Sequence, residues 1–485
     1  MPVQNLLDSL SLDPASPKPL KRQLYERLRQ LISERVLRPG SELPSTRMLC
    51  RDLGLGRNTV IAAYEQLVTE GYLQNRSTGR LIVVDLPLGP IPHDDVRAEV
   101  YRPSLSSRGQ LISGQPFHFG SAGNSAFHPG MPDAQDFPFT AWSRLVARRA
   151  SSAGDTLFGT YDVLGLPALR EAISHYLTVA RGVRCTPEQV VITTGAQAAF
   201  DMLARVLLDP GDPVWMEEPG YYGAHAAFLA AGARLEPLFV DESGWALDIA
   251  PAAGAKAIYV TPSCHHPLGA TMRLEHRLRL LEIAERFNAW VIEDDYHYNV
   301  QPVPAMQGTD RSRRVIYVGT FSKMLFPALR IGFVVVPLPL VDALTQSICA
   351  SGHIAPLFIQ AALVDFIREG HLSKHLRRMR RIYAARRDAF EELCEEVLRE
   401  WVELVPTHSG IQTTGLFKVD IDDHQVAEAA RRRGIMVSPL SMQYRHGKAR
   451  QGLLLGYAAT PQRAMGKHMQ KLKEAILEVA GEKQL

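Results

Sequence analysis

Residues 315–337 constrain the fold of this chain more than any other segment. Two apolar, β-branched runs, VIYVG and IGFVVVP, flank the short connection TFSKMLFPALR. Runs of this kind are typical of strands that are buried on both faces of a parallel sheet. The segment therefore predicts an α/β domain with a mostly parallel central sheet, in which both runs are parallel strands.

The connection between the two runs carries Lys323 at the mouth of the predicted sheet. Burial or a neighbouring cation lowers the pKa of a lysine, and the neutral amine can then form a Schiff base with an aldehyde. Thr320, Ser322 and Arg330 supply donors suited to a phosphate. These groups favour a site for pyridoxal 5′-phosphate (PLP). Taken alone, these residues are equally consistent with a lysine that only caps the end of a strand.

The length of 485 residues predicts two or three domains, because single cores rarely grow beyond about 250–300 residues. The five cysteines are scattered without a CxxC pair, so we expect neither a metal site nor a disulfide framework. No leader pattern and no apolar run of transmembrane length is evident. We therefore expect a cytoplasmic protein without a membrane segment.

Charge distinguishes the first 84 residues from the rest. They carry 12 Lys and Arg against 8 Asp and Glu, a net charge of +4, whereas the whole chain carries +3. A basic head on a near-neutral body favours a polyanion as the partner of the head.

Residues 18–84 predict a DNA-binding domain. Apolar residues at helical spacing predict a first helix over residues 19–36. A second helix follows over residues 45–53, with Ser45 as its N-cap, and a glycine turn leads to a third helix over residues 57–71. The last two form a helix-turn-helix, and the following residues predict a two-stranded wing.

Five polar side chains of this domain are placed to contact double-stranded DNA. The start of the third helix is the end that enters a major groove, where arginine and asparagine suit base edges and threonine suits phosphate or a thymine methyl. Arginines in the second helix and in the wing are placed for the backbone or the minor groove. The predicted contacts are Arg47, Arg57, Asn58, Thr59 and Arg76. Arginines that merely face water are the alternative.

The segment LPSTRMLCRDLGLGRNTVIAAYEQLVTEGYL closely resembles the GntR-type winged helix-turn-helix of bacterial transcription regulators. The resemblance covers residues 18–84. Residues 85–116 are rich in Pro, Gly and Ser, and we expect a semi-extended linker there. Strands and helices then alternate over residues 117–485, with a smaller C-terminal α/β subdomain.

Two strand ends in the body predict ligand contacts. The strand over residues 190–193 runs into a glycine turn and a helix, whose free N–H groups favour an anion, although a plain turn is also consistent. The strand WVIEDD ends in Asp294 and Asp295, at the edge where open α/β sheets bind ligands. Consecutive strand residues point to opposite faces. If Asp294 faces the ligand, Asp295 points away from it, and we expect Asp295 to be a cap or surface acid.

Residues 118–485 resemble a fold-type I aminotransferase domain. Joined to the head, the chain is similar to the MocR/GabR subfamily of GntR-family transcription regulators. Seven ordered motifs carry the resemblance: FHPGMPDAQDFPF, YDVLGLPALRE, TTGAQAAFD, EEPGYYG, TPSCHHPLG, IEDDYHY and GTFSKMLFPALRIGF. The resemblance implies a homodimer that holds PLP in its body and binds operator DNA through its head.

The resemblance also implies roles for single residues. Lys323 would form the Schiff base with PLP, and Asp294 would pair with the pyridine nitrogen. Tyr296 would bond to the phenolic oxygen, Tyr221 would stack on the ring, and Tyr161 would reach the phosphate of the neighbouring subunit. The remaining phosphate contacts would be Gly195, Ala196, Gln197, Thr320 or Ser322, and Arg330.

Two departures from the aminotransferase pattern bear on activity. His266 stands where aminotransferases have an asparagine that binds the phenolic oxygen. Leu454 stands where they have an arginine that clamps the substrate carboxylate, and Arg445 or Arg450 would have to fold back to replace it.

The sequence therefore predicts a PLP-dependent DNA-binding transcription regulator. We expect it to sense PLP or an amino-compound effector through a Schiff base at Lys323, without physiological turnover. One alternative is an active PLP-dependent aminotransferase that carries a DNA-binding domain. Another is a body that has lost its cofactor and only dimerises the heads.

Overall fold

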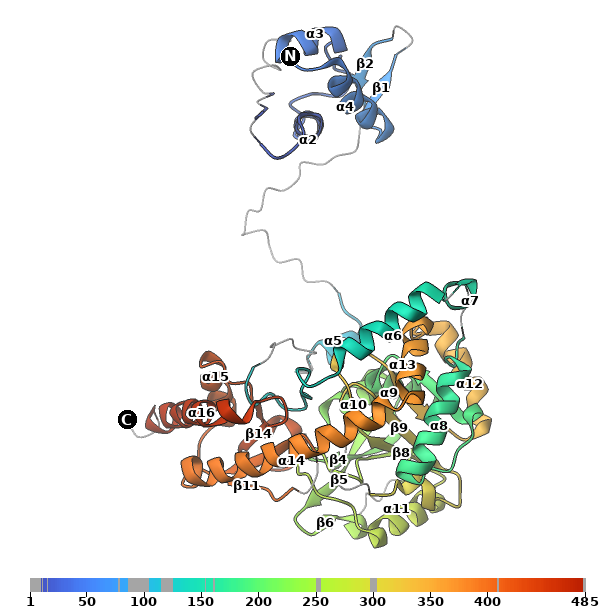
Figure 1. The fold of residues 1–485 in the computed structure, drawn as a ribbon, viewed down its shortest axis with the longest axis vertical. Coiled ribbons are helices and arrows are strands. Elements are labelled where there is room, and N and C mark those ends of the chain that lie inside the picture. Colours follow the sequence, from blue (N-terminus) through green and yellow to red (C-terminus); the bar gives the residue numbers. More distant parts are fainter. Residues whose placement is uncertain are drawn as a thin grey trace. The chain divides into compact units, whose positions relative to one another are not determined.

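A computed structural model describes residues 10, 12–14, 16–76, 79–85, 104–114, 125–152, 154–159, 162–249, 254–296, 303–407 and 410–482. The chain divides into two compact units, residues 1–104 and 105–485, called the head and the body below (Figure 1). Each is considered by itself.

The head is a winged helix-turn-helix, as the sequence predicts. Its helices are α2 (Leu20–Ser33), α3 (Thr46–Leu53) and α4 (Arg57–Thr69), and its wing pairs β1 (Leu73–Asn75) antiparallel with β2 (Leu81–Val83). The predicted first helix is too long at its C-terminal end, because the chain leaves α2 after Ser33.

Local signals fix the ends of the head helices. Ser45 caps α3 by accepting a hydrogen bond from the Met48 backbone N–H at 3.3 Å. Gly54 ends α3 in the left-handed conformation, with φ +64°, which glycine adopts without steric cost. The turn therefore leaves Arg57 as the first residue of α4.

An eight-stranded sheet forms the centre of the body. In spatial order its strands are β3 (Val190–Thr193), β10 (Gly332–Val335), β9 (Val315–Thr320), β8 (Trp290–Asp295), β7 (Ala257–Val260), β4 (Pro213–Glu218), β5 (Arg234–Asp241) and β6 (Gly244–Trp245). The neighbours from β9 to β5 are parallel. The predicted mostly parallel sheet is confirmed.

The prediction that both apolar runs of residues 315–337 are parallel strands is wrong for the second run. β10 is antiparallel to both β9 and β3. The connection over residues 321–331 contains only the short turn η4 (Pro327–Leu329), whereas adjacent parallel strands need a longer crossover. The chain reverses there, and Lys323 lies in the reversal.

Helices cover both faces of this sheet. One face packs against α9 (Ala196–Leu207), α10 (Tyr222–Ala230) and α12 (Leu338–Ser351). The other packs against α6 (Phe139–Ser152), α8 (Pro167–Arg181), α11 (Leu274–Phe287) and α13 (Leu357–Arg368), with α7 (Gly154–Phe158) beside α13. Successive residues of a strand point alternately into the cores on the two faces of the sheet, so two neighbouring residues of one strand lie on different faces.

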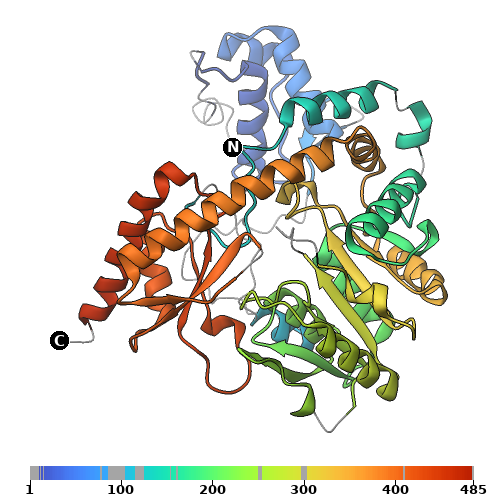
Figure 2. The same ribbon diagram turned by 60° about the horizontal axis from the view of Figure 1, so that its bottom comes forward.

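A smaller C-terminal subdomain holds a second, antiparallel sheet. Its order is β11 (Val402–Leu404), β12 (Gln412–Phe417), β14 (Gly452–Gly456) and β13 (Ser438–Pro439). α15 (Asp423–Arg432) and α16 (Gln462–Glu482) pack on it. The long helix α14 (His371–Leu398) contributes to the cores of both subdomains (Figure 2). The predicted smaller subdomain is confirmed.

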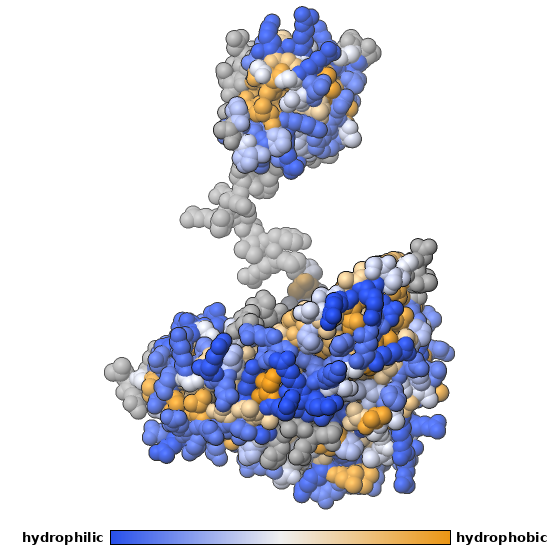
Figure 3. Space-filling model, in the orientation of Figure 1, coloured by the Kyte–Doolittle hydropathy of each residue, from blue (hydrophilic) through white to orange (hydrophobic). Residues whose placement is uncertain are grey.

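Part of the segment predicted as a semi-extended linker is helical. α5 (Ser107–Ser113) begins where the Ser106 hydroxyl accepts a hydrogen bond from the Gly109 N–H at 3.0 Å, and it contacts α10. Within the described parts of the chain, no helix combines the length and apolarity needed to cross a membrane. The surface that Figure 3 presents is mostly hydrophilic, with separate apolar patches.

Candidate PLP site and DNA-binding surface

Lys323 is partly buried at the reversal between β9 and β10. Its Nζ donates a hydrogen bond to the carbonyl oxygen of Gly130 at 2.6 Å. Burial lowers the pKa of Lys323 to about 8, against the opposing effect of the Asp294 carboxylate. An amine with this pKa is neutral in an appreciable fraction of molecules at physiological pH, so it is a competent nucleophile.

Asp294 occupies the carboxyl end of β8 on the face that packs against α9 and α10. The Tyr259 hydroxyl donates to its Oδ2 at 2.6 Å, and its Oδ1 has no hydrogen-bond partner among the described residues. Burial raises the pKa of Asp294 to about 7. Tyr259 was not identified from the sequence, because a tyrosine in the apolar run AIYV has the same pattern as an ordinary core residue.

The predicted anion cradle is the turn between β3 and the start of α9. Gly195 has φ +105°, and a β-carbon there would lie 3.3 Å from Cζ of Arg330. A β-carbon at Gly332 would lie 2.8 Å from the Gly195 carbonyl carbon. Gly332 also pairs with Thr320, whose hydroxyl accepts a hydrogen bond from the Ser322 N–H at 3.2 Å. The structure thus brings the predicted phosphate contacts together around one glycine-lined turn.

The first turn of α9 continues this cradle. Ala196 begins the helix, and Gln197 donates from Nε2 to the Gly223 carbonyl at 2.7 Å. Tyr221, just before α10, has its ring 5.4 Å from the ring of His266 in an edge-on arrangement. The predicted stacking residue therefore lies beside the phosphate contacts.

His266 and Tyr296 form the other side of the site. The Tyr296 hydroxyl donates to the Cys264 carbonyl at 3.2 Å, and the rings of Tyr296 and His266 lie 6.1 Å apart. Nε2 of His266 is 3.2 Å from Oε1 of Gln443. Burial lowers the pKa of His266 to about 4, so the imidazole is neutral at pH 7. Gln443 follows β13 and carried no local signal that could have placed it here.

Asp295 is not the cap or surface acid that the sequence predicts. Its Oδ2 accepts hydrogen bonds from Nε of Arg181 at 2.7 Å and from the Tyr317 hydroxyl at 2.5 Å. Both Arg181 and Asp295 are buried. Asp295 faces the side of the sheet that packs against α8, and Arg181 is the last residue of α8. The prediction was wrong because the partner of Asp295 is distant in the sequence.

The predicted DNA contacts lie at the surface of the head. Arg47, Arg57, Asn58 and Arg76 are exposed and Thr59 is partly exposed. None of the three arginines forms an ion pair with a described carboxylate, whereas Arg80 of the wing is paired with Glu42. Tyr161, the predicted contact to a neighbouring subunit, lies outside the described residues.

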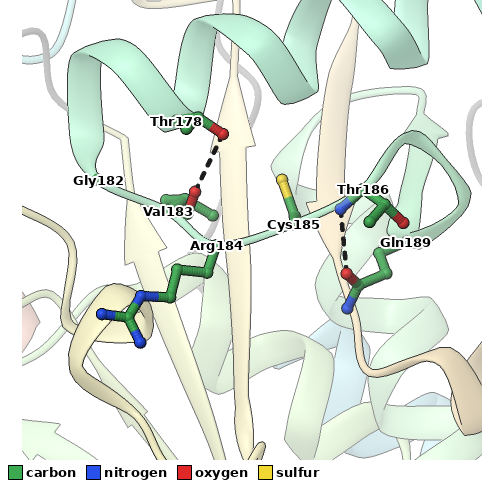
Figure 4. Close-up of a pocket in the computed structure, with 7 residues that line it drawn as sticks. All are labelled: Thr178, Gly182, Val183, Arg184, Cys185, Thr186 and Gln189. Atoms are coloured by element: carbon green, nitrogen blue, oxygen red, sulfur yellow. Dashed lines mark hydrogen bonds between the residues drawn. The ribbon is translucent and has the colours of Figure 1, made fainter.

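A hollow of about 580 Å³ lies near the amino end of the edge strand β3, away from Lys323, which follows the carboxyl end of β9 (Figure 4). It is bordered by Thr178, Arg184, Cys185 and Gln189, near the amino end of β3. Burial raises the pKa of the Cys185 thiol, which keeps it protonated at neutral pH. The hollow therefore adds no reactive group to the site.

Two family models match this chain. The model described as bacterial regulatory proteins, gntR family, matches residues 20–83, and the model described as aminotransferase class I and II matches residues 131–451. The first match coincides with the helices and wing of the head. The second includes the whole central sheet and most of the candidate PLP site.

Curated relatives match over nearly the full length. A probable rhizopine catabolism regulatory protein, MocR, from Rhizobium meliloti is 46% identical, and the match covers 96% of each chain. A pyridoxine biosynthesis transcriptional regulator, PdxR, from Corynebacterium glutamicum is 28% identical over 96% of this chain and 98% of its own. Among solved structures, the α-aminoadipate aminotransferase LysN of Thermus thermophilus, complexed with N-(5′-phosphopyridoxyl)-L-leucine, superimposes with a TM-score of 0.68. It is 25% identical over 78% of this chain and 96% of its own.

Fold, head and relatives together define a bacterial-type transcription regulator that joins a winged helix-turn-helix to an aminotransferase-like body. The chain belongs to the MocR/GabR subfamily of the GntR family. Aminotransferases of the class that the body resembles depend on PLP.

Proposed function

We propose that the body binds PLP at Lys323 and that the protein regulates transcription in response to PLP or to an amino compound that reaches the same site. The residues fit the cofactor. The buried Oδ1 of Asp294 and the hydroxyl of Ser322 both lack a hydrogen-bond partner among the described residues, and Gly195, which has no β-carbon, lets the guanidinium of Arg330 approach the start of α9 closely.

PLP supplies an aldehyde and an electron-withdrawing ring when it is bound. Lys323 presents its amine to the aldehyde, and Asp294 accepts a charge-assisted hydrogen bond from the ring nitrogen. Tyr221 covers one ring face, while Tyr296 and His266 border the phenolic oxygen. The phosphate is held by Ser322 or Thr320, Arg330 and the start of α9, with Gly195, Ala196 and Gln197.

The observation that carries the proposal is a partly buried lysine amine within electrostatic range of a buried acid, Asp294, that keeps one oxygen unsatisfied. A buried carboxylate oxygen without a donor is costly unless a ligand completes it. The experiment is a titration of the full-length protein with PLP, followed by visible absorption. We expect a yellow band in the wild type and its loss in Lys323→Ala, and absence of a Lys323-dependent band at saturating PLP would refute the proposal.

We also propose that the protein acts as a homodimer on double-stranded operator DNA in the bacterial cytoplasm. Several large apolar side chains of the body are exposed, namely Leu111 and Ile112 of α5, Phe139 of α6 and Phe158 of α7. Their exposure favours an interface in which a second subunit covers them. The DNA contacts proposed are those of the helix-turn-helix and wing. Sedimentation of the full chain tests the dimer, and a monomer at micromolar concentration would contradict it.

An enzymatic role is the second candidate, and the structure favours it less. Leu454, where aminotransferases carry the carboxylate-binding arginine, is buried within β14. The two arginines that could replace it lie elsewhere. Nη1 of Arg450 is 3.6 Å from Oε1 of Glu242, and Arg445 is exposed, with its guanidinium close to Tyr222. A turnover assay with keto-acid acceptors separates the two roles, and we expect no sustained turnover.

A further inference from the structure

Two neighbouring segments of the body supply groups that are assigned to the PLP ring. The carboxyl end of β8 carries Asp294 and continues into Tyr296, and the loop after β7 carries His266. Because β7 and β8 are paired and parallel, both segments leave the sheet at the same edge. The spacing of the two segments therefore sets where the partner of the ring nitrogen lies relative to the groups that border the phenolic oxygen.

Arg181 bridges these two segments on the opposite face of the sheet. Its Nε donates a hydrogen bond to Oδ2 of Asp295 at 2.7 Å, and its Nη2 donates to Oγ of Ser263 at 2.7 Å. Asp295 directly follows Asp294, and Ser263 directly precedes Cys264. One planar guanidinium therefore joins the end of β8 to the loop after β7.

The bridge is anchored at its base. Arg181 is the last residue of α8, and Gly182 ends the helix in the left-handed conformation with φ +66°. The Arg181 carbonyl accepts a hydrogen bond from the Ala305 N–H at 2.8 Å, and its side chain is buried. A buried guanidinium that is paired with a carboxylate presents its donors in a fixed fork, so it fixes the spacing of its two acceptors.

A second arginine on the same face supports the loop without forming a bridge. The guanidinium of Arg277, from α11, donates to the carbonyls of Pro262, Met272 and Pro304, which all lie outside β8. The nearby acid Glu293 accepts hydrogen bonds from backbone N–H groups of η3 (Met306–Thr309). These two groups therefore hold main chain on this face, whereas Arg181 joins one segment to the other.

A connection between the same two segments also lies on the PLP face. The Tyr296 hydroxyl donates to the Cys264 carbonyl at 3.2 Å. A phenol has a single proton, so Tyr296 releases this carbonyl when it donates to the phenolic oxygen of PLP. The bridge through Arg181 is unaffected by that change and continues to hold the loop against β8.

We propose that Arg181 is a positioning residue of the PLP site. It acts from the far face of the sheet, through Asp295 and Ser263, and sets the spacing between Asp294 and the loop that carries His266. This inference rests on the proposed PLP binding and adds to it a residue that the sequence did not single out.

The visible absorption band of bound PLP reports this spacing. Donors to the phenolic oxygen stabilise its negative charge and so lower the pKa of the neighbouring imine nitrogen. If the groups that border this oxygen are displaced, the pH midpoint of the band rises. A loss of stability that leaves the surroundings of the cofactor intact does not move the midpoint.

Two variants break the bridge at different points. Arg181→Lys keeps the buried charge but loses the fixed fork, and Ser263→Ala removes only the acceptor on the loop. PLP binding to each full-length variant is titrated by visible absorption across a range of pH. We expect the affinity for PLP to fall about tenfold in Arg181→Lys and about fivefold in Ser263→Ala, and the midpoint of the band to rise by about half a pH unit or more in both.

Tyr317→Phe is the matched control. It removes a hydrogen bond to the same carboxylate of Asp295 but leaves the loop after β7 untouched. Its unfolding midpoint in denaturant should fall, while its affinity for PLP stays within about twofold of the wild type and the pH midpoint of its band does not move.

The outcomes separate this inference from the proposed function. Absence of a Lys323-dependent band in the wild type defeats the proposed function and this inference with it. A normal wild-type band whose affinity and pH midpoint are unchanged in Ser263→Ala overturns only the inference. Equal shifts in Ser263→Ala and Tyr317→Phe overturn it too, because they would show a general loss of packing. If Arg181→Lys fails to fold, Ser263→Ala decides.

Discussion

The amine of Lys323 is held 2.6 Å from the carbonyl oxygen of Gly130, in a segment that also belongs to the C-terminal subdomain. Just before Gly130, Ala126 forms a bridge with Ile435, and the Phe127 carbonyl accepts a hydrogen bond from the Gly456 N–H at 2.8 Å. The lysine therefore joins the large sheet to the small one when its amine is free. A Schiff base at this amine would leave its nitrogen with at most one hydrogen, so it would compete with the hydrogen bond to Gly130.

The lowered pKa of Lys323 predicts the pH dependence of PLP capture. Burial lowers this pKa to about 8 from the usual value near 10.4, so the reactive neutral amine accumulates as pH rises through 8. We expect the observed rate of band formation to rise with pH and to reach half its maximum near pH 8. Stopped-flow absorption between pH 6 and pH 10.5, at constant ionic strength, measures it. A midpoint above about 9.5 would show that the amine is not desolvated as the structure has it.

Tyr259→Phe should weaken PLP binding through Asp294. The hydroxyl of Tyr259 lowers the pKa of Asp294, which burial has already raised to about 7, so its removal leaves more of the acid protonated at pH 7. A protonated Asp294 cannot accept the charged ring N–H as a carboxylate does. A hydrogen bond to a charged group contributes about 1.5–3 kcal/mol, and we expect affinity for PLP to fall by about tenfold at pH 7 and by less at pH 9.

Tyr317→Phe is the matched control for this variant. It removes an equivalent hydrogen bond from Asp295, on the other face of the same sheet. Stability should fall while the affinity for PLP stays within about twofold. Equal losses of PLP affinity in the two variants would argue for a general loss of packing instead of an effect on Asp294.

The features predicted well from sequence are those determined by neighbours along the chain. Ser45 and Gly54 mark the ends of α3 through their own backbone chemistry, and the apolar runs around Lys323 define β9 and β10 as strands. The direction of β10 was also contained in the sequence, since residues 321–331 are too few for a crossover helix. The prediction overlooked that length.

The missed features depend on partners far along the chain. Arg181 and Asp295 are separated by 114 residues, and Gln443 reaches His266 across 177 residues. Nothing in the local sequence distinguishes an acid that receives a buried arginine from one that faces solvent. The helix α5 was missed for a related reason, because seven residues are too few for a clear apolar period and its support comes from α10.

Asp295→Ala should be strongly destabilising. It leaves Arg181, which is 8% exposed, without its carboxylate in the interior, and breaking a buried pair in this way costs about 3–5 kcal/mol. Denaturant unfolding followed by circular dichroism measures the change. Glu275→Ala removes an exposed partner of Arg273 and should cost less than about 1 kcal/mol. Similar midpoints for the two variants would contradict the structural role of the pair.

Arg57→Ala should weaken operator binding without affecting the body. Arg57 begins α4, is exposed, and has no ion-pair partner among the described residues, so its charge is available to DNA. Loss of a base contact costs about 1–3 kcal/mol, and loss of a phosphate contact reduces the salt dependence of binding by about one charge. Fluorescence anisotropy with operator DNA at several salt concentrations distinguishes these two cases.

Arg22→Ala is the matched control. It removes the same charge from α2, where Arg22 is paired with Glu26 at 3.0 Å, and should change affinity for operator DNA by less than about threefold. Because every proposed PLP contact belongs to the body, we expect the Lys323-dependent band to be the same in both variants. Unchanged operator affinity in Arg57→Ala would mean that the start of α4 is not the recognition end.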